Sequence, residues 1–578
     1  MPDSAPIGKN DSATPWLGWS GNLSHTPGNQ RRPRQETMQA DYVIVGAGSA
    51  GCVLATRLTE DANTSVILIE AGGKDYNPLI HVPAGFYKML DHDKLTWKYR
   101  SEPDPGTNGR AIVYTRGRVV GGSSSINGLI YIRGQPEDYD HWAQLGNRGW
   151  SWDDCLPVFR AAERWEGQEN EVRGKDGPLH TSNMDRSPIC AAVVEAGKQL
   201  GLAYQEDVNG ITHGSVDTIG WCQQTRNGRR RASAARTYLT RALSRPNLRL
   251  ITNAMVHRVV FEGKRAVGVE FARGRDHGGT TERATAGREV ILSAGAIGSP
   301  HILQLSGVGD AEHLSDIGVP VVHALKGVGR NMQDHFQARI SYPVAGMSTA
   351  NEKARGIPLA IEVLRWMFTG KGMLTYSPSL VAASIKVLES SASSDMQVTF
   401  APGSFKDGQI GELEETPGIS AGAWQMRPLS RGYVKAKSNR PEDMPLINPR
   451  YLSDETDRMA LLGGLRFARR MFEAPALKPY VGAESLPGMD VQTDDELLDY
   501  ARRYGGTCYH ATCTCMMGQH PLAVVDDQLR VHGMEGLRVI DASIMPAVTS
   551  TNTNAPTIMI AEKGAVMLKA ATRQRLAA

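Results

Sequence analysis

One histidine and two cysteines near the C-terminal end of the chain have the types and spacing of residues that do chemistry. In TCYHATCTCMMG, residues 507–518, His510 precedes Cys513 and Cys515. Such residues serve as metal ligands, as a thiol nucleophile with its base, or as a general base beside uninvolved cysteines. A zinc site normally needs a Cys-x₂₋₄-Cys pair and two further ligands at suitable spacing, and the other cysteines supply no second pair. We therefore expect no metal, while the thiol and the base both stay open at this point.

A second group of candidate residues lies near the N-terminus. Residues 41–51 read DYVIVGAGSAG, a short apolar strand followed by Gly46, Gly48 and Gly51 and then by a helical pattern. The next apolar run, SVILIEAGG, ends in Glu70. Strand, glycine turn, helix, strand and acid form the full context of a dinucleotide-binding fingerprint, in which helix amides face a pyrophosphate and the acid binds ribose hydroxyls. This pattern does not separate NAD from FAD.

The elements that must position these residues are marked by further turns along the chain. A second glycine-serine loop, RGRVVGGSSSING, spans residues 116–128, and SAGAIGSPHILQLSGVG follows at 293–309. GVGRNMQDH spans 327–335, and LRVIDASIMP at 537–546 is a strand that reaches Asp541. NTNAPTIMIAEK at 552–563 reads as a polar turn that enters an apolar helix.

Composition limits the class of protein. The chain has 578 residues, of which 41% are apolar and 22% charged, so a soluble protein with more than one domain is expected. A net charge of +3 gives no reason to expect nucleic acid as a partner, and no apolar run is long enough for a transmembrane segment. Seven cysteines in so long a chain favour a reducing compartment, so we expect cytoplasmic localisation or a peripheral place on a membrane. Residues 1–38 are rich in polar and turn-forming residues and predict a disordered or surface-draped tail.

Together these motifs resemble the glucose-methanol-choline (GMC) family of flavin oxidoreductases. The resemblance covers about residues 40–573 and includes GRVVGGSSSINGLIYIRG at 117–134, GAIGSPHILQLSGVG at 295–309, and the C-terminal pair YHATCTCMMG and NTNAPTIMIAEK. The C-terminal pattern is most similar to the bacterial choline, L-sorbose and alcohol dehydrogenase branches of that family.

The resemblance implies an α/β fold with two parts. A discontinuous, Rossmann-like FAD-binding domain is expected from residues 39–155, 230–333 and 505–573. An α+β substrate domain with an antiparallel sheet is expected from residues 156–229 and 334–504. A homo-oligomer is an option that the sequence leaves open.

The resemblance also implies which residues hold FAD. They lie in the two glycine loops, after the second strand, in the middle of the chain and before the last helix: Gly46, Gly48, Ser49, Ala50, Gly51, Glu70, Ala71, Arg118, Gly121, Gly122, Ser123, Asn127, Gly128, Val256, Ala294, Gly295, Asp541, Ala542, Asn552 and Thr553. Some family members attach FAD covalently through a histidine just before the loop asparagine. Ile126 stands there in this chain, so we expect non-covalent FAD.

Oxidation of an alcohol by a flavin requires removal of a proton from oxygen and of a hydride from carbon. A histidine with an ordinary pKa near 6.5 is largely neutral at pH 7 and can take the proton. The resemblance implies that His510 is that base, that Asn554 is its uncharged partner, and that the flavin N5 takes the hydride. The cysteines are then small buried residues, and His335 is structural. The electrons would pass to a quinone- or dye-type acceptor or to oxygen.

Other functions use the same scaffold, because a fold alone does not define a reaction. A hydroxynitrile lyase keeps FAD without net redox chemistry, and a flavoprotein without turnover is a third option. The substrate is left undefined, with Tyr376, Trp424 and Met426 as candidates to face its pocket.

Overall fold

Strands from three distant parts of the chain form one mixed sheet. The computed structural model describes residues 38–210, 216–274, 279–408 and 411–577, and within them this sheet has seven strands. Their order is β13 (Leu248–Ile251), β2 (Val66–Ile69), β1 (Met38–Val45), β16 (Thr281–Leu292), β15 (Arg265–Arg273) and β14 (Ala254–Glu262), with β27 (Leu537–Val539) also on β16. The pairs on either side of β1 are parallel, and β14, β15 and β16 pair antiparallel.

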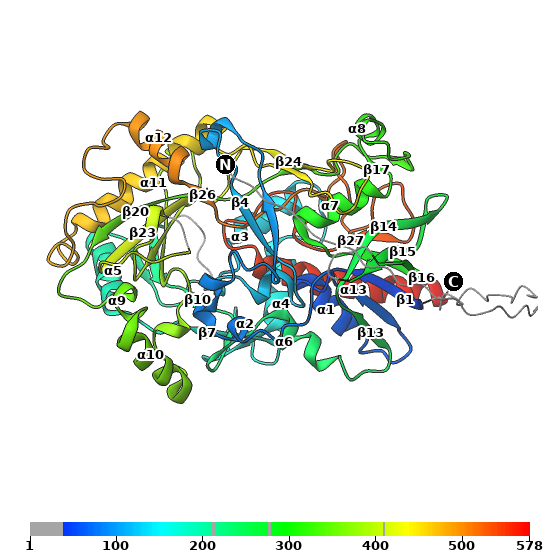
Figure 1. The fold of residues 1–578 in the computed structure, drawn as a ribbon, viewed down its shortest axis with the longest axis horizontal. Coiled ribbons are helices and arrows are strands. Elements are labelled where there is room, and N and C mark those ends of the chain that lie inside the picture. Colours follow the sequence, from blue (N-terminus) through cyan, green and yellow to red (C-terminus); the bar gives the residue numbers. More distant parts are fainter. Residues whose placement is uncertain (1–37, 211–215, 275–278, 409–410, 578) are drawn as a thin grey trace, which may run out of the picture. The chain divides into compact units, whose positions relative to one another are not determined.

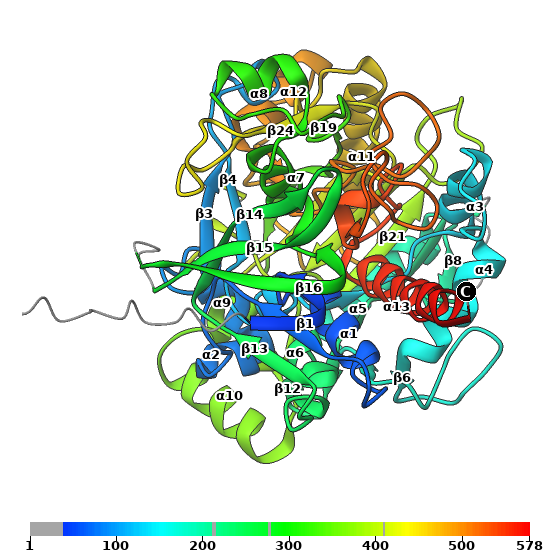
Figure 2. The same cartoon turned by 90° about the vertical axis from the view of Figure 1, so that its right-hand side faces the viewer.

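The first β-α-β unit forms because its strands are apolar on both faces. Tyr42 to Val45 pair in register with Val66 to Ile69, and all eight residues are buried. A strand buried on both faces is typical of parallel sheets covered by helices. Here α1 (Ser49–Leu58) and the last helix, α13 (Asn554–Ala577), lie side by side against the sheet (Figures 1 and 2).

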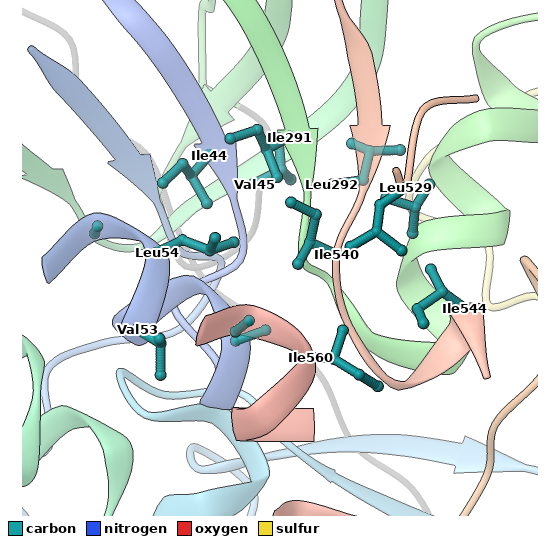
Figure 3. Packing of buried hydrophobic residues seen from close by; sticks show 14 of the residues in the cluster. Ile44, Val45, Val53, Leu54, Ile291, Leu292, Leu529, Ile540, Ile544 and Ile560 are labelled. Carbon is teal, nitrogen blue, oxygen red and sulfur yellow. The ribbon is translucent and has the colours of Figure 1, made fainter. Parts of the chain in front are cut away.

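The core of this part gathers side chains from the beginning, middle and end of the chain. Figure 3 shows Ile44 of β1, Leu54 of α1, Ile291 of β16, Ile540 after β27 and Ile560 of α13 converging in one cluster. All five are fully or almost fully buried. Because distant segments share one core, the last helix is held where its first residues can meet the loop after β1.

A second, mostly antiparallel sheet also has seven strands in the described residues. Its order is β26 (Gly506–Thr507), β20 (Phe336–Pro343), β23 (Gly418–Gln425), β22 (Met396–Ala401), β21 (Val381–Ile385), β9 (Thr218–Trp221) and β8 (Ala203–Gln205), and only β8 and β9 pair parallel. One face carries Ala338, Ile340, Val398 and Phe400, which join a core with α5 (Pro188–Gln199) and α11 (Glu455–Glu473).

The two sheets agree with the predicted fold class, a Rossmann-like part combined with an antiparallel sheet. The proposed domain boundaries stay predictions. β1 begins at Met38, and the rest of the predicted tail lies outside the described residues. Among the described helices, none combines the length and apolar character that crossing a bilayer requires.

Candidate active site

The glycine fingerprint forms a tight turn at the carboxyl end of β1. Gly46 has a φ of 96°, and a Cβ there would lie 2.6 Å from the carbonyl oxygen of Ser293. A Cβ on Gly51 would lie 1.9 Å from the carbonyl oxygen of Gly46, so neither position admits a side chain. No side chain caps the N-terminus of α1 at Gly48. The first amide groups of the helix therefore remain available to an anion.

Glu70 lies where β2 ends, beside this turn. Its carboxylate accepts hydrogen bonds from the backbone N–H groups of Ala47, at 2.9 Å, and Gly72, at 2.8 Å. Burial raises the pKa of Glu70 to about 7, although the two amides favour the charged form. The side chain is thus held at the position where the fingerprint places a ribose.

The second glycine loop touches the first. The N–H of Gly121 donates to the carbonyl oxygen of Ala47 at 2.7 Å, and a Cβ on Gly122 would lie 2.6 Å from the Cα of Gly48. Close by, Asp541 accepts from the N–H of Gly295 at 2.8 Å. Three segments that are far apart in sequence therefore meet around one space.

That space is a cavity of about 450 Å³ that runs from the glycine turns to His510. Every residue predicted to bind the cofactor lines it except Gly51 and Gly121. The space beside these two is filled by protein, because Gly51 packs on Gly46 and a Cβ on Gly121 would lie 2.1 Å from the Oγ of Ser125, and their contact with a cofactor stays a prediction. Both shape the turns.

His510 lies in the loop after β26 and is 7% exposed. Its backbone N–H donates to Asp334 Oδ1 at 2.7 Å. The other oxygen of that buried carboxylate accepts from Thr507 Oγ1 at 2.6 Å and from the hydroxyls of Tyr114 and Tyr451. Asp334 therefore fixes the loop that carries His510.

His335 defines the orientation of the His510 ring. Its Nε2 lies 2.8 Å from the carbonyl oxygen of Met426, which can only accept, so Nε2 carries the proton. In a neutral ring its Nδ1 is then an acceptor, and this atom lies 2.8 Å from Nδ1 of His510. His510 must donate from Nδ1, which leaves the lone pair on its Nε2.

Both histidines are neutral at pH 7. Burial lowers the pKa of His335 to about 3, and the carbonyl of Met426 only partly opposes this. For His510, burial is again the main cause, and the positive charge of Arg116 and repulsion from His335 add to it, so its pKa lies well below 6.5. A neutral His510 with a free lone pair is the form that a general base requires.

The side chain that contacts His510 Nε2 in this structure is that of Asn552, two residues before the predicted Asn554. Asn552 Nδ2 lies 2.9 Å from His510 Nε2. Asn554, at the start of α13, accepts instead from the Oγ of Ser49 at 2.8 Å, which places it at the first glycine turn. In this structure Asn552, and not Asn554, therefore contacts His510, and the pairing of Asn554 with His510 in catalysis stays a prediction. Both asparagines line the cavity.

Cys513 and Cys515 take no part in the cavity lining, although Cys508 does. Cys513 and Cys515 are buried, and burial raises the pKa of Cys513 to about 11 and that of Cys515 well above its usual range. They are therefore thiols at neutral pH and not nucleophilic thiolates. Across the described residues, no group of three or more His, Cys, Asp or Glu side chains is placed to hold a metal ion.

Residues of the antiparallel sheet that the sequence reasoning missed also line the cavity. Gln337, Arg339, Gln397 and Thr399 alternate with the apolar residues of β20 and β22, a period-2 signal that was readable in the sequence. Of the substrate-pocket candidates, Trp424 lines the cavity, with its ring centroid 5.8 Å from that of His510. Tyr376 and Met426 do not line it; Met426 instead orients His335 through its carbonyl.

Comparison with known proteins shows the family to which the chain belongs. Residues 40–337 match the N-terminal model and residues 428–561 the C-terminal model of a family described as GMC oxidoreductase. The mitochondrial choline dehydrogenases of Mus musculus and Homo sapiens are each 43% identical over 543 residues, covering 91% of this chain and 89% of the relative. The oxygen-dependent choline dehydrogenase of Escherichia coli K12 is 43% identical over 547 residues, covering 92% of this chain and 96% of the relative.

Solved structures share the fold along almost the whole chain. Pyridoxine 4-oxidase from Mesorbium loti has a TM-score of 0.81 at 31% identity, over 91% of this chain and 98% of the other. An FAD-dependent oxidoreductase from Chaetomium thermophilum has a TM-score of 0.85 at 28% identity, over 92% and 100% of the two chains.

Proposed function

Because the chain belongs to the GMC oxidoreductase family, we propose that His510 and Asn552 activate an alcohol for oxidation at the end of an FAD-binding cavity. FAD is the cofactor of this chain, and oxidation of a CH–OH group is its class of reaction. The relatives do not favour a lyase or a flavoprotein without turnover.

The residues present fit FAD. The uncapped amides of α1 begin where Gly48 and Gly122 approach each other closely. A pyrophosphate bound there would face backbone groups and would meet no side chain. Glu70 stands at the ribose end, and Ile126 lines the cavity where a covalent attachment would need a nucleophilic side chain. We propose that FAD is held without a covalent bond. When bound, FAD supplies the acceptor for the hydride of the alcohol.

One observation carries the roles of the protein groups: His510 Nε2 and Asn552 Nδ2 lie 2.9 Å apart and both line the cavity. At this distance the amide of Asn552 donates to the lone pair of Nε2, so an alcohol hydroxyl must displace this contact before it gives its proton to Nε2. The amide of Asn552 donates a hydrogen bond to the same oxygen and stabilises the negative charge that develops there. Asn552 is uncharged, so it does not compete for the proton.

The groups behind His510 act as positioning residues. Asp334 holds the backbone of His510, and His335 holds Nδ1–H, so the ring presents the basic nitrogen to the substrate. When the base is held in one tautomer and one orientation, a larger fraction of the molecules is in the reactive state.

The acceptor and the location are also proposals. A quinone- or dye-type acceptor, or oxygen, would reoxidise the flavin, and one group of relatives is named oxygen-dependent choline dehydrogenase. All seven cysteines are unpaired, which fits a cytoplasmic site or a peripheral membrane site.

The test is anaerobic mixing of the holoenzyme with a panel of alcohols while the visible flavin bands are recorded. Bleaching by at least one alcohol is the expected result. His510→Ala should retain FAD and slow this reduction by about 10²–10⁴-fold. A yellow protein that no alcohol bleaches would overturn the proposed reaction, and a normal rate in His510→Ala would remove His510 from it.

A further inference from the structure

The antiparallel sheet presents a polar face to the cavity. We call Gln337, Arg339, Gln397 and Thr399 the polar wall. Gln337 and Gln397 flank Trp424 across β20, β23 and β22, and Arg339 and Thr399 flank Gly422 in the next row. All four side chains line the cavity, as does Trp424. The side chain of Gln337 lies over Gly422, where a Cβ would be 2.3 Å from Gln337 Nε2.

Arg339 is a cation in this wall without a counterion. Its guanidinium donates to the carbonyl oxygen of Gly408 at 3.1 Å and to the side-chain oxygen of Gln337. No carboxylate of the described residues forms an ion pair with it. By contrast, the buried Arg133 and Arg173 share the carboxylate of Glu163. Burial lowers the pKa of Arg339, but an arginine remains charged at neutral pH, so the wall lacks a negative partner.

One further polar atom of the wall has no hydrogen-bond partner. Gln397 is 3% exposed, lines the cavity, and its Oε1 has no hydrogen-bond partner. A buried polar atom without a partner costs free energy unless a ligand or water satisfies it. Oε1 of Gln397 only accepts, so it calls for a donor such as water or a hydroxyl, whereas the guanidinium of Arg339 calls for an acceptor.

The acids that line the cavity lie elsewhere. Glu70 and Asp541 are engaged by backbone amides at the cofactor turns. Glu442 and Asp443 lie in the loop after β24 (Gly432–Lys435), where they act electrostatically on His257 and His301 of the Rossmann-like part. In the described residues, the polar wall itself contributes no negative charge to the cavity.

From this charge pattern we propose that the polar wall binds a carboxylate, so that the substrates are alcohols that also carry an acid group. The inference rests on the proposed function, in which the hydroxyl lies between His510 and Asn552. The guanidinium of Arg339 meets the carboxylate with paired N–H donors, and the neighbouring donor on this wall is Gln337 Nε2. A quaternary ammonium alcohol would bring a second positive charge toward Arg339, so selectivity here differs from that named for the choline dehydrogenase relatives.

The substrate test compares alcohols that differ in the charge of the distant group. Glycolate, γ-hydroxybutyrate, γ-hydroxybutyramide and choline are mixed anaerobically with the holoenzyme, and flavin reduction is recorded. We expect a hydroxy acid to have the highest kcat/KM. Arg339→Met should lower that value by roughly a hundredfold while changing the amide little, and Arg339→Lys should restore part of it. Faster reduction by choline or by the amide, or an equal loss for both in Arg339→Met, would overturn the inference.

A binding measurement separates this inference from the proposed function. Butyrate and butyramide cannot be oxidised as alcohols, but they can occupy the subsite and perturb the flavin spectrum. We expect butyrate to bind more tightly than butyramide in the wild type and equally in Arg339→Met. If no alcohol is oxidised and butyrate still shows this dependence on Arg339, only the proposed reaction fails. If alcohols are oxidised and butyrate binds no better than butyramide, only the subsite fails.

An independent surface feature lies on α10 (Gly356–Thr369), which projects at the lower edge of both views (Figures 1 and 2). Ile357, Ile361, Leu364 and Phe368 are 78%, 59%, 54% and 82% exposed. Their spacing of four, three and four residues places them on one face of the helix. A contiguous exposed apolar stripe of this kind marks an interaction surface.

The surroundings of this stripe are basic. Arg229, Arg230, Arg365 and Lys371 are exposed, and the hairpin of Arg229 is tied to the helix by a hydrogen bond from Trp366 Nε1 to its carbonyl at 2.9 Å. The acid of the helix, Glu362, is buried, accepts from the N–H of Met373 and lies 3.6 Å from Arg365. The exposed face is therefore apolar with a positive rim.

We infer that α10 docks on an anionic phospholipid surface with its apolar stripe among the acyl chains and its basic rim at the headgroups. At 14 residues the helix is too short to cross a bilayer and would lie in the interface. The test is co-sedimentation of the holoenzyme with phosphatidylcholine vesicles, with and without phosphatidylglycerol.

Binding should require phosphatidylglycerol, weaken in high salt, and be lost in Ile361→Glu/Phe368→Glu. Val566→Glu, at another exposed apolar residue, serves as the matched control and should bind normally. Absence of binding to either vesicle would overturn the inference. A second contradicting result would be a dimer in light scattering that Ile361→Glu/Phe368→Glu abolishes, together with no binding to vesicles. The stripe would then bind a second copy of the chain.

Discussion

The Nδ1 atoms of His335 and His510 lie 2.8 Å apart, and the carbonyl of Met426 decides which of them carries the proton. The chain of contacts from Met426 through His335 leaves Nε2 of His510 as the basic atom, next to Asn552. His335 is thus a buried structural residue that also sets the tautomer of His510. The predictions below follow from this arrangement and from the cavity that it closes.

The two asparagines before and at the start of α13 should have separable roles. Asn552→Ala removes the donor beside His510 and is expected to slow flavin reduction by about 10²-fold with FAD retained. Asn554→Ala breaks the contact with Ser49 at the first glycine turn, so it should weaken FAD retention more than it slows reduction of the FAD that remains. Flavin-to-protein ratios and anaerobic stopped-flow rates measure the two effects. The opposite pattern would restore Asn554 as the partner of His510.

His335 should act through the tautomer of His510. His335→Leu removes the acceptor for Nδ1–H, so His510 can place its proton on Nε2, and kcat should fall by about tenfold or more. His335→Gln keeps an acceptor for His510 and a donor for Met426, and it should retain more activity than His335→Leu. KM and FAD content are measured in both. A purely structural role would lower stability or FAD content equally in the two variants without this difference in kcat.

The rate of flavin reduction should fall only at acid pH. His510 must be neutral to accept a proton, and burial with nearby His335 and Arg116 lowers its pKa well below 6.5. Protonation therefore inactivates the base only below the pH at which a free histidine would be protonated. A pH profile of the anaerobic reduction rate, limited to pH values where FAD stays bound, should be flat near pH 7. An acid limb centred at or above pH 6.5 would contradict it.

Flavin should leave the protein on denaturation. Ile126 has no atom that can bond covalently to the flavin, so precipitation with acid or organic solvent should release all FAD into the supernatant. Absorbance of the supernatant and of the washed pellet gives the result. Yellow colour that stays with the pellet would show a covalent link at another residue.

Much of the FAD site could be predicted from the sequence because its information is local. Gly46, Gly48 and Glu70 are set by a turn and by the ends of two neighbouring strands, and short-range sterics demand glycine where backbone approaches backbone. His510 could also be proposed as the base from the sequence, because a single motif contains it. These features depend on residues that are close together in the chain.

Two contacts of the site depended on the tertiary structure, and so did the surroundings of the polar face of β20. Asn552 and Asn554 are two residues apart, and the direction of each side chain follows from the turn before α13 and from the packing of that helix on α1. The contact between His335 and His510 joins segments separated by 175 residues.

The alternation of β20 was visible in the sequence, but an alternating strand does not reveal whether its polar face meets solvent or a cavity. Because α11 packs on the apolar face of the sheet, Arg339 on the opposite face lines the cavity. The sequence by itself determined the cofactor turns and the class of chemistry, because these are encoded in local backbone geometry. Only the tertiary structure decided which distant groups complete the site, because that depends on how separate elements pack against one another.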